Sequence, residues 1–243
     1  MDDNNLNSFV IAVLEFLESK DHKLARSLPS RNFYRGTTTA DRLLGNKHIE
    51  LKFNSNGPLA FIINTIHSGK APHVMGHWLG LSLHFNQQKK LVVVRYFDSF
   101  GDRGETYKNI WQYITNIKRQ CKKRDIRFRL DRLIRGIQYH DSKLCGPYAA
   151  FFIAKSYCER NRIKIAHIFK HFKKDRIKND LMIQRFLVNN YPSHRCHDNP
   201  IYNKMKVSLD TLRTGPMPPF CPRTTLGLEE CLPECGCVGD CNH

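Results

Sequence analysis

The sequence predicts an α+β domain in which a central mixed sheet is flanked by helices. Three short apolar runs rich in β-branched residues are typical of strands, and they lie between segments whose apolar residues recur at helical spacing. A chain of 243 residues is also long enough to bury one sizeable core without disulfides or structural metals. We therefore expect one main domain over residues 1–200, followed by a proline- and cysteine-rich tail over residues 201–243.

The first half of the chain contains the three predicted strands. An amphipathic helix opens the chain, with apolar residues at helical spacing over residues 6–17 and an asparagine before them as a cap. Residues 59–66, 77–85 and 91–98 are the apolar runs expected to form strands. The polar sequence NQQKK separates the last two, which predicts a hairpin with its turn centred near Gln88.

The second half of the chain is expected to be mainly helical. Residues 106–120 carry one apolar helical face and are followed by a basic strand-like segment, DIRFRL. Residues 144–158, LCGPYAAFFIAKSYC, lack a polar face, which predicts a helix buried in the middle of the domain. Two further amphipathic helices are expected around residues 161–174 and 180–189.

The chain is strongly basic, with 39 Lys and Arg against 22 Asp and Glu and a formal net charge of +17. Such an excess attracts polyanions and favours non-specific contact with nucleic acid phosphates. Much of it lies in residues 118–135 and 160–178, although a solvated helix face would give a similar pattern. The residues that we expect to bind duplex DNA are Lys170, Lys173, Lys174 and Arg176.

The sequence also predicts a compartment. The N-terminal MDDNNLNSF is acidic and leads into no apolar signal, so we expect no secretion. No apolar run approaches the roughly 18 to 20 residues that a membrane span requires. We therefore expect an intracellular protein without a membrane partner, in which the nine cysteines are mainly reduced thiols.

His77 and Trp78 stand at the start of the second predicted strand. A lone histidine there is either a core residue bonded to a backbone carbonyl or a general base held for chemistry. The hairpin places Asp98 across from His77, at the cross-strand distance of about 5 Å that lets a carboxylate accept the Nδ1 proton and leaves Nε2 as the base. A one-residue shift of register would turn Asp98 away, and Asp102 or Glu105 would then serve instead.

Cys145 begins the predicted buried helix, and Pro147 in the first turn supports a helix start at or beside it. The free amides and the dipole of that terminus favour the thiolate, and Gly146 leaves space for a substrate carbonyl. A cysteine in an apolar segment is otherwise a small inert core residue. Because a histidine and a carboxylate accompany it in this chain, Cys145 is a candidate nucleophile.

In chain order, GHW, YFDSFG and a glutamine seven positions before CGPY closely resemble the adenovirus-type endopeptidase. This family belongs to the wider clan of ubiquitin-like-protein (SUMO) deconjugating cysteine proteases. The resemblance extends from about Ala60 to Tyr157. Asp98 departs from it, because adenovirus enzymes carry Glu there and the deconjugating branch carries Asp, whereas the spacing from Gln138 to Cys145 favours the viral branch.

The resemblance implies a papain-like, adenain-like fold with the nucleophile at the N-terminus of a buried helix. It implies His77 as general base, Asp98 as its orienting acid and Cys145 as nucleophile. Gln138 is implied as the side-chain donor to the oxyanion hole, beside the Cys145 backbone amide. Trp78 matches the aromatic residue that packs the family's histidine in place.

The resemblance further implies an endopeptidase of viral maturation that cleaves viral precursor proteins at glycine-containing sites, in the virion and the host cell nucleus. Duplex DNA is the implied partner, which we expect to bind away from the catalytic residues, and we expect a monomer. One alternative is a ubiquitin-like-protein deconjugating protease, which would prefer a folded modifier ending in Gly-Gly. An alternative of another class is a non-catalytic basic DNA-packaging protein.

The chemistry implied here requires no cofactor. Four cysteines of the tail are close in sequence, but their 3-1-3 intervals differ from the paired C-x-x-C spacing of zinc sites, so we expect no zinc. These residues are Cys231, Cys235, Cys237 and Cys241. Activation by a disulfide-linked peptide is a trait of the adenovirus-type family, and Cys121 is a candidate for that linkage.

Overall fold

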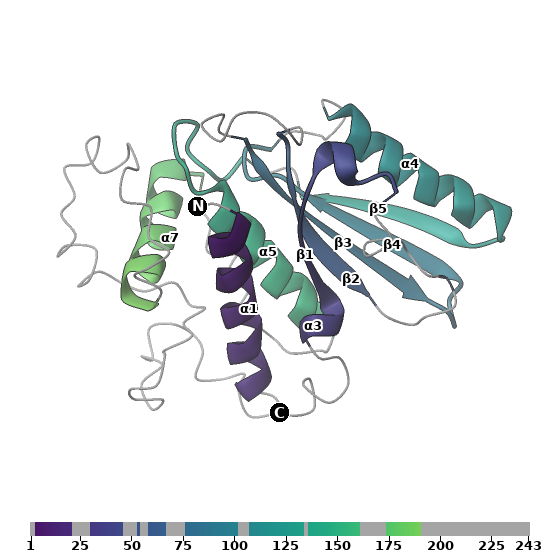
Figure 1. The fold of residues 1–243 in the computed structure, drawn as a ribbon, viewed down its shortest axis with the longest axis horizontal. Helices are drawn as coiled ribbons and strands as arrows, with labels where there is room; N and C mark the ends of the chain where they lie inside the picture. Colours follow the sequence, from purple (N-terminus) through teal and green to yellow (C-terminus); the bar gives the residue numbers. More distant parts are fainter. Residues whose placement is uncertain are drawn as a thin grey trace.

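The protein has the predicted α+β architecture, in which five strands form one mixed sheet with helices on both faces (Figure 1). The computed structural model describes residues 3–20, 30–45, 53, 58–66, 76–101, 107–133, 136–160 and 174–190. The tail predicted over residues 201–243 lies outside the described residues, as does nearly all of the helix predicted over residues 161–174. The predicted fold class is therefore confirmed, whereas the domain boundary near residue 200 stays a prediction.

The strands follow one another across the sheet in their order along the chain. The inner pairs β2–β3 and β3–β4 are antiparallel, and the outer pairs β1–β2 and β4–β5 are parallel. The strands are β1 (Tyr34–Thr39), β2 (Leu59–Asn64), β3 (Trp78–Asn86), β4 (Leu91–Phe97) and β5 (Arg127–Leu133). All but β1 were predicted; its sequence, YRGTTT, has one large apolar residue and a glycine, so no apolar alternation marks it.

The helices confirm the predicted periodicities, although their ends differ by a few residues. In the described residues the main helices are α1 (Asp3–Lys20), α4 (Lys108–Lys123), α5 (Cys145–Arg160) and α7 (Arg176–Asn190), with the short α3 (Ser30–Phe33) and η1 (Ala40–Arg42) flanking β1. Helix α5 is buried on nearly all sides, as its lack of a polar face predicted. No helix in the described part of the chain is long and apolar enough to cross a membrane.

The sheet separates two apolar clusters. Helix α4 covers one face, where Ile110, Ile114 and Ile117 pack among inward-facing residues of β2, β3 and β4. Helices α1, α5 and α7 gather over the other face, and α5 packs mainly against β3. Figure 1 shows α4 and α5 on opposite sides of the sheet, with α1 and α7 beyond α5. Each face is apolar where a helix covers it, because apolar side chains of the helix and the sheet meet there.

Helix α5 approaches β3 most closely at Gly80. A methyl group added there would lie 2.3 Å from Cδ1 of Phe152, which is closer than carbon atoms pack. Phe152 cannot easily move aside, because its ring stacks on Phe97 with centroids 5.2 Å apart. The absence of a side chain at Gly80 therefore sets the separation of α5 from the sheet, and with it the position of the helix that begins at Cys145.

We expect Gly80→Ala to lower the free energy of unfolding by about 1 to 3 kcal/mol, the usual cost of overpacking a dense core. Urea denaturation measures this loss. Phe152→Leu in the Gly80→Ala background should recover part of it, because the smaller side chain makes room for the methyl group. A Gly80→Ala protein as stable as the wild type would contradict the close packing.

Candidate active site

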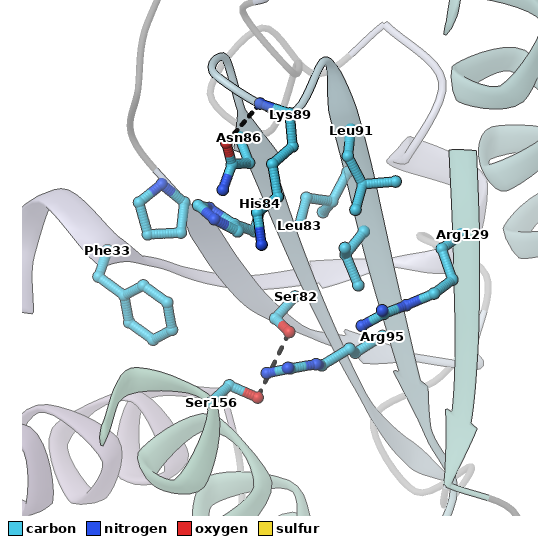
Figure 2. A pocket seen from close by; sticks show the side chains of 12 residues that line it. Phe33, Ser82, Leu83, His84, Asn86, Lys89, Leu91, Arg95, Arg129 and Ser156 are labelled. Carbon is cyan, nitrogen blue, oxygen red and sulfur yellow. Dashed lines mark hydrogen bonds between the residues drawn. The ribbon is translucent and has the colours of Figure 1, made fainter. Parts of the chain in front are cut away.

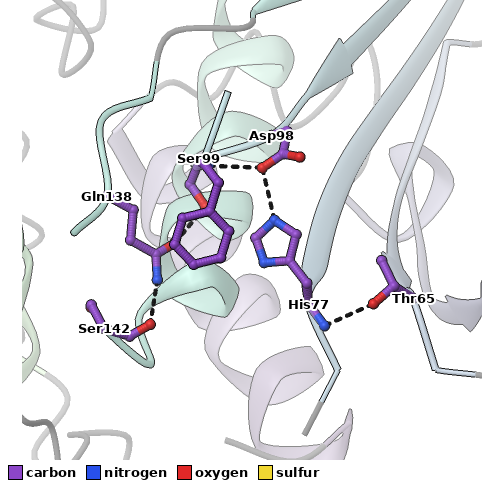
Figure 3. A network of polar contacts seen from close by, with 7 residues as sticks. Thr65, His77, Asp98, Ser99, Gln138 and Ser142 are labelled. Carbon is purple, nitrogen blue, oxygen red and sulfur yellow. Dashed lines mark hydrogen bonds and ion pairs between the residues drawn. The ribbon is translucent and has the colours of Figure 1, made fainter. Parts of the chain in front are cut away.

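The β3–β4 hairpin brings His77 and Asp98 together (Figure 3). Gly80 pairs with Phe97, and continuing this register for three residues places His77 opposite Phe100, with Asp98 as its diagonal neighbour. His77 Nε2 lies 2.8 Å from Asp98 Oδ1. The alternative partners, Asp102 and Glu105, lie outside the described residues. The predicted contact is therefore present, although the register differs from the prediction by two residues and so keeps Asp98 on the same face.

The ring orientation corrects the prediction. Asp98 was expected to accept a proton from Nδ1, whereas the structure places its carboxylate at Nε2. A diagonal neighbour starts about 7 to 8 Å away, so the carboxylate meets the ring nitrogen that extends farthest from the backbone. His77 Nδ1 is buried and makes no hydrogen bond with the described residues, so Nδ1 and not Nε2 is the nitrogen available for proton transfer.

A tight turn after β4 holds the Asp98 carboxylate in place. Asp98 is fully buried, and its Oδ1 also accepts a hydrogen bond of 2.8 Å from the Phe100 backbone amide. The Gly101 amide donates to the Asp98 carbonyl, and Gly101 adopts a φ of +88° that favours glycine. The carboxylate therefore faces His77 because the turn, and not a flexible side chain alone, directs it.

The ring packed on His77 belongs to Phe100. The two rings are stacked, with centroids 4.5 Å apart and an interplanar angle of 26°. Trp78, to which this role was assigned, is buried in the apolar cluster around α5, where it lies beside Gly146. Phe100 belongs to the same YFDSFG segment as Asp98. The correct pairing of β3 with β4 places Phe100 opposite His77, so that pairing would have identified it.

The backbone of His77 is held by a neighbouring segment. Its amide donates to Thr65 Oγ1 at 2.9 Å, and its carbonyl accepts from the Thr65 amide at 2.9 Å. These two bonds extend the pairing of β2 with β3 by one residue. The histidine is therefore anchored on one side by Thr65 and on the other by Asp98, which leaves the ring little freedom.

Cys145 stands at the start of α5, as predicted, and is a nearly buried free thiol. The Tyr148 amide donates to the Leu144 carbonyl at 3.0 Å, so the regular helical bonding begins within the first turn. Amides before that point have no carbonyl partner inside the helix, and the positive end of the helix dipole favours an anion there. The sulfur therefore occupies a position that supports negative charge.

His77 and Cys145 interact electrostatically. Burial lowers the pKa of His77, but the hydrogen bond to Asp98 and the hydrogen-bonding capacity and charge of Cys145 raise it by more, and the net result is a pKa of about 9. A histidine with this pKa is protonated at neutral pH. The electrostatics therefore favour a protonated His77 ring, which the Asp98 carboxylate bonds directly and which Cys145 influences from nearby.

Gln138 is fixed to the same turn as Asp98 (Figure 3). The Ser99 carbonyl accepts from the amides of Ile137 and Gln138 at 2.9 and 3.0 Å, and Ser99 Oγ donates to Gln138 Oε1 at 2.5 Å. Gln138 Nε2 donates to the Ser142 carbonyl at 2.6 Å. The side-chain amide is fully buried, and these bonds direct its nitrogen toward the loop that precedes Cys145.

Asp180 on α7 supports that loop, and the sequence contained no signal for it. Its Oδ1 accepts a hydrogen bond of 2.7 Å from Tyr148 Oη and lies 3.5 Å from the Tyr139 amide nitrogen. Burial raises the pKa of Asp180 to about 6, although hydrogen bonds from Ser142, Tyr148 and the Tyr139 amide oppose the rise. The next residue back, Asn179, donates to the Ile137 carbonyl at 2.9 Å. Helix α7 therefore holds the segment that carries Gln138 in place through Asn179 and Asp180.

The residues predicted to bind DNA are only partly described. Lys174 and Arg176 are exposed, and Lys170 and Lys173 lie outside the described residues. A methyl group added to Gly136 would lie 2.7 Å from the Arg176 guanidinium and 2.8 Å from the Phe100 carbonyl. Arg176 therefore lies close to Phe100, whose ring packs on His77. The basic residues were expected to lie away from the candidate active site, and this expectation is wrong for Arg176.

Cys121 does not suit a disulfide to an activating peptide. It is fully buried among the apolar residues between α4 and the sheet, and burial raises the pKa of its thiol to about 11. A neutral, inaccessible thiol is a poor nucleophile for disulfide exchange. The cysteines of the tail lie outside the described residues, and within the described part no group of three or more His, Cys, Asp or Glu could hold a metal ion.

Solved structures with partly similar folds include a viral protease and a bacterial effector. Two crystal structures of the ASFV pS273R protease match with TM-scores of 0.32 and 0.37, at 19% and 14% identity. They cover 41% and 58% of this chain, which spans 34% and 56% of theirs. The Legionella pneumophila effector protein RavZ matches with a TM-score of 0.29 at 16% identity, over 45% of this chain and 34% of its own.

No family model and no curated protein matches the sequence.

The raised pKa of Asp180 predicts a pH dependence of stability. Between its usual pKa of 3.8 and about 6, the native state keeps a proton that the unfolded state loses, so this group lowers stability as pH rises through that window. Asp180→Asn cannot ionise and should remove up to about 3 kcal/mol of this decline. Urea denaturation at several pH values measures it.

Asp141→Asn is the matched control for this measurement. The Asp141 side chain is 56% exposed and lies on the loop that Asp180 contacts. In Asp141→Asn, the free energy of unfolding should decline with pH as steeply as in the wild type. Identical slopes in the wild type and Asp180→Asn would show that Asp180 is not a buried acid with a raised pKa.

Proposed function

We propose that this protein is a cysteine endopeptidase whose nucleophile is Cys145. The observation that carries the proposal is the hydrogen bond from buried Asp98 to the far nitrogen of His77, a histidine that interacts electrostatically with Cys145 at the N-terminus of α5. A structural cysteine needs no such partners. Nucleophile, base and orienting acid are the three parts that activate a thiol for attack on a carbonyl.

The reaction follows from the orientation of the ring. Cys145 gives its proton to His77 Nδ1, and the thiolate attacks the scissile carbonyl to form a tetrahedral oxyanion. The imidazolium then returns the proton to the leaving amine, and the carbon–nitrogen bond breaks to leave a thioester on Cys145. His77 takes a proton from water, which attacks the thioester, releases the acid and restores the thiol. Asp98 holds the ring and stabilises its charge throughout.

Gln138 is the proposed side-chain donor to the oxyanion. A primary amide has two N–H groups, and the bond to the Ser142 carbonyl uses one of them. The second is the proposed donor, together with the backbone amide of Cys145. Donors fixed before the reaction stabilise the oxyanion most, and the bonds between Ser99 and Gln138 provide such fixing.

The biological setting is a further part of the proposal. We propose viral maturation, with precursor proteins cut at glycine-containing sites by a monomeric enzyme in the virion and the host cell nucleus, assisted by non-specific binding to duplex DNA. The charge of +17 and exposed Lys174 and Arg176 support the DNA partner. A deconjugating protease of the same chemistry would instead prefer a folded modifier ending in Gly-Gly, so assays of precursor proteins against modifier conjugates separate the two.

The test of the nucleophile is site-resolved alkylation. Iodoacetamide should modify Cys145 much faster than Cys121, because Cys145 lies at a helix N-terminus and interacts with His77, whereas Cys121 is enclosed in the apolar core. Peptide mapping by mass spectrometry measures the rates. Cys145→Ala should abolish cleavage of precursor proteins, and His77→Ala should slow both reactions.

Cys121→Ala is the matched control, since it removes a buried thiol that packs among apolar residues between α4 and the sheet. It should leave alkylation of Cys145 and proteolysis unchanged. Proteolysis that persists in Cys145→Ala would end the proposal.

A second prediction concerns the pH profile of proteolysis. His77 must be protonated to deliver a proton to the leaving amine, so kcat/KM should fall as pH rises through about 9. Asp98 contributes to the raised pKa of His77, and Asp98→Asn should therefore move this alkaline limb to lower pH and lower the rate. An alkaline limb at the same pH in both proteins would contradict the assigned role of Asp98.

A further inference from the structure

A cavity opens on the sheet face that α5 covers only in part (Figure 2). Its volume is about 320 Å³, and its polar lining comes from β3, β4, β5, the hairpin and α5. The polar residues of the lining are Ser82, His84, Asn86, Lys89, Arg95, Arg129 and Ser156. The cavity lies toward the hairpin end of the sheet, whereas His77 precedes the opposite end of β3.

This part of the sheet is polar because helix α5 no longer covers it. Alternate residues of β3 share one face, and on this face Trp78 and Gly80 meet α5. Ser82 is the next, and its Oγ donates to Ser156 Oγ on α5 at 3.3 Å. His84 is the next residue on this face, and its side chain lines the cavity. The hydroxyl pair therefore forms the floor of the cavity at the last point of contact.

The cavity concentrates positive charge. Arg95 and Arg129 both contact the Asp131 carboxylate, at 3.7 and 2.9 Å, which holds the two guanidinium groups on the same side of the sheet. Figure 2 shows both side chains extending over this face. Lys89 adds a third cation, and none of the described residues that line the cavity is acidic. Because three cations and no acidic side chain of the described residues line it, the cavity favours an anion.

We propose that this cavity binds a phosphate group carried by a nucleotide-sized ligand. Two arginines, a lysine and serine hydroxyls provide the fork-shaped and point-charge donors that bind phosphate oxygens. Phe33, Pro58 and Leu91 form apolar walls beside the cations, which suits a ligand with an apolar or aromatic body. A volume of about 320 Å³ lies at the small end of the range of ligand sites.

This site is separate from the candidate active site. His84 lies seven residues along β3 from His77, which corresponds to about 23 Å at the rise of an extended strand. The proposal therefore does not depend on the proposed proteolysis. Binding should be unchanged in Cys145→Ala, so the failure of one proposal is distinguishable from the failure of the other.

The test is calorimetric titration of the full chain with pyrophosphate and with adenosine monophosphate at low ionic strength. Both should bind the wild type, and Arg95→Gln and Arg129→Gln should each raise Kd by about ten-fold or more, the effect of losing one charge-assisted hydrogen bond. Far-ultraviolet circular dichroism checks that each variant is folded.

Arg132→Gln is the matched control. Arg132 is on the same strand as Arg129 and loses the same charge, but its guanidinium lies 5.0 Å from the centre of the Trp111 ring, on the α4 face. It should change Kd less than two-fold. Equal weakening by Arg132→Gln and Arg129→Gln, or no binding of either ligand to the wild type, would overturn the proposal.

A competition arm identifies the source of the phosphate. A single-stranded oligonucleotide without terminal phosphates should displace adenosine monophosphate if the cavity takes a backbone phosphate of nucleic acid. If it does not, the cavity takes a free phosphorylated compound. Both results support a phosphate site, provided that Arg129→Gln weakens the binding that is observed.

Discussion

The turn formed by Asp98, Ser99 and Phe100 is the constraint on which the candidate active site depends. Three consecutive residues hold the two side chains proposed as base and oxyanion donor: the Asp98 carboxylate bonds His77, the Phe100 ring stacks on His77, and Ser99 bonds the backbone and side chain of Gln138. The Gly101 amide closes the turn on the Asp98 carbonyl. Because the turn directly follows β4, the rigidity of the sheet is transmitted to the site.

The electrostatics of the site follow from burial. A buried imidazolium is costly by itself, and burial alone would make His77 neutral. The buried carboxylate on one side and the cysteine at a helix N-terminus on the other reverse this effect, so that the charged ring is favoured. Each partner also needs the ring, since a buried Asp98 without a cation would be unstable.

The two faces of the sheet differ in how far a helix covers them. Helix α4 packs among apolar residues of β2, β3 and β4, and the result is a closed apolar core. On the other face α5 begins at the active-site end and leaves the sheet near Ser82, beyond which the strands carry arginine, histidine and asparagine. The sheet therefore carries the candidate active site at one end and a basic cavity at the other, with α5 between them.

The sequence by itself determined the elements whose pattern is local: the amphipathic helices, the buried α5, the β3–β4 hairpin and the candidates His77, Asp98 and Cys145, whereas Gln138 came only from the family resemblance. Spacing along the chain reports such features because neighbours in sequence are neighbours in a helix or hairpin. Only the tertiary structure decided that Nε2 faces Asp98, that Phe100 covers the ring and that Asp180, 41 residues from Tyr139, supports the Gln138 loop. Contacts over such separations depend on how finished elements pack, and no local periodicity encodes that packing.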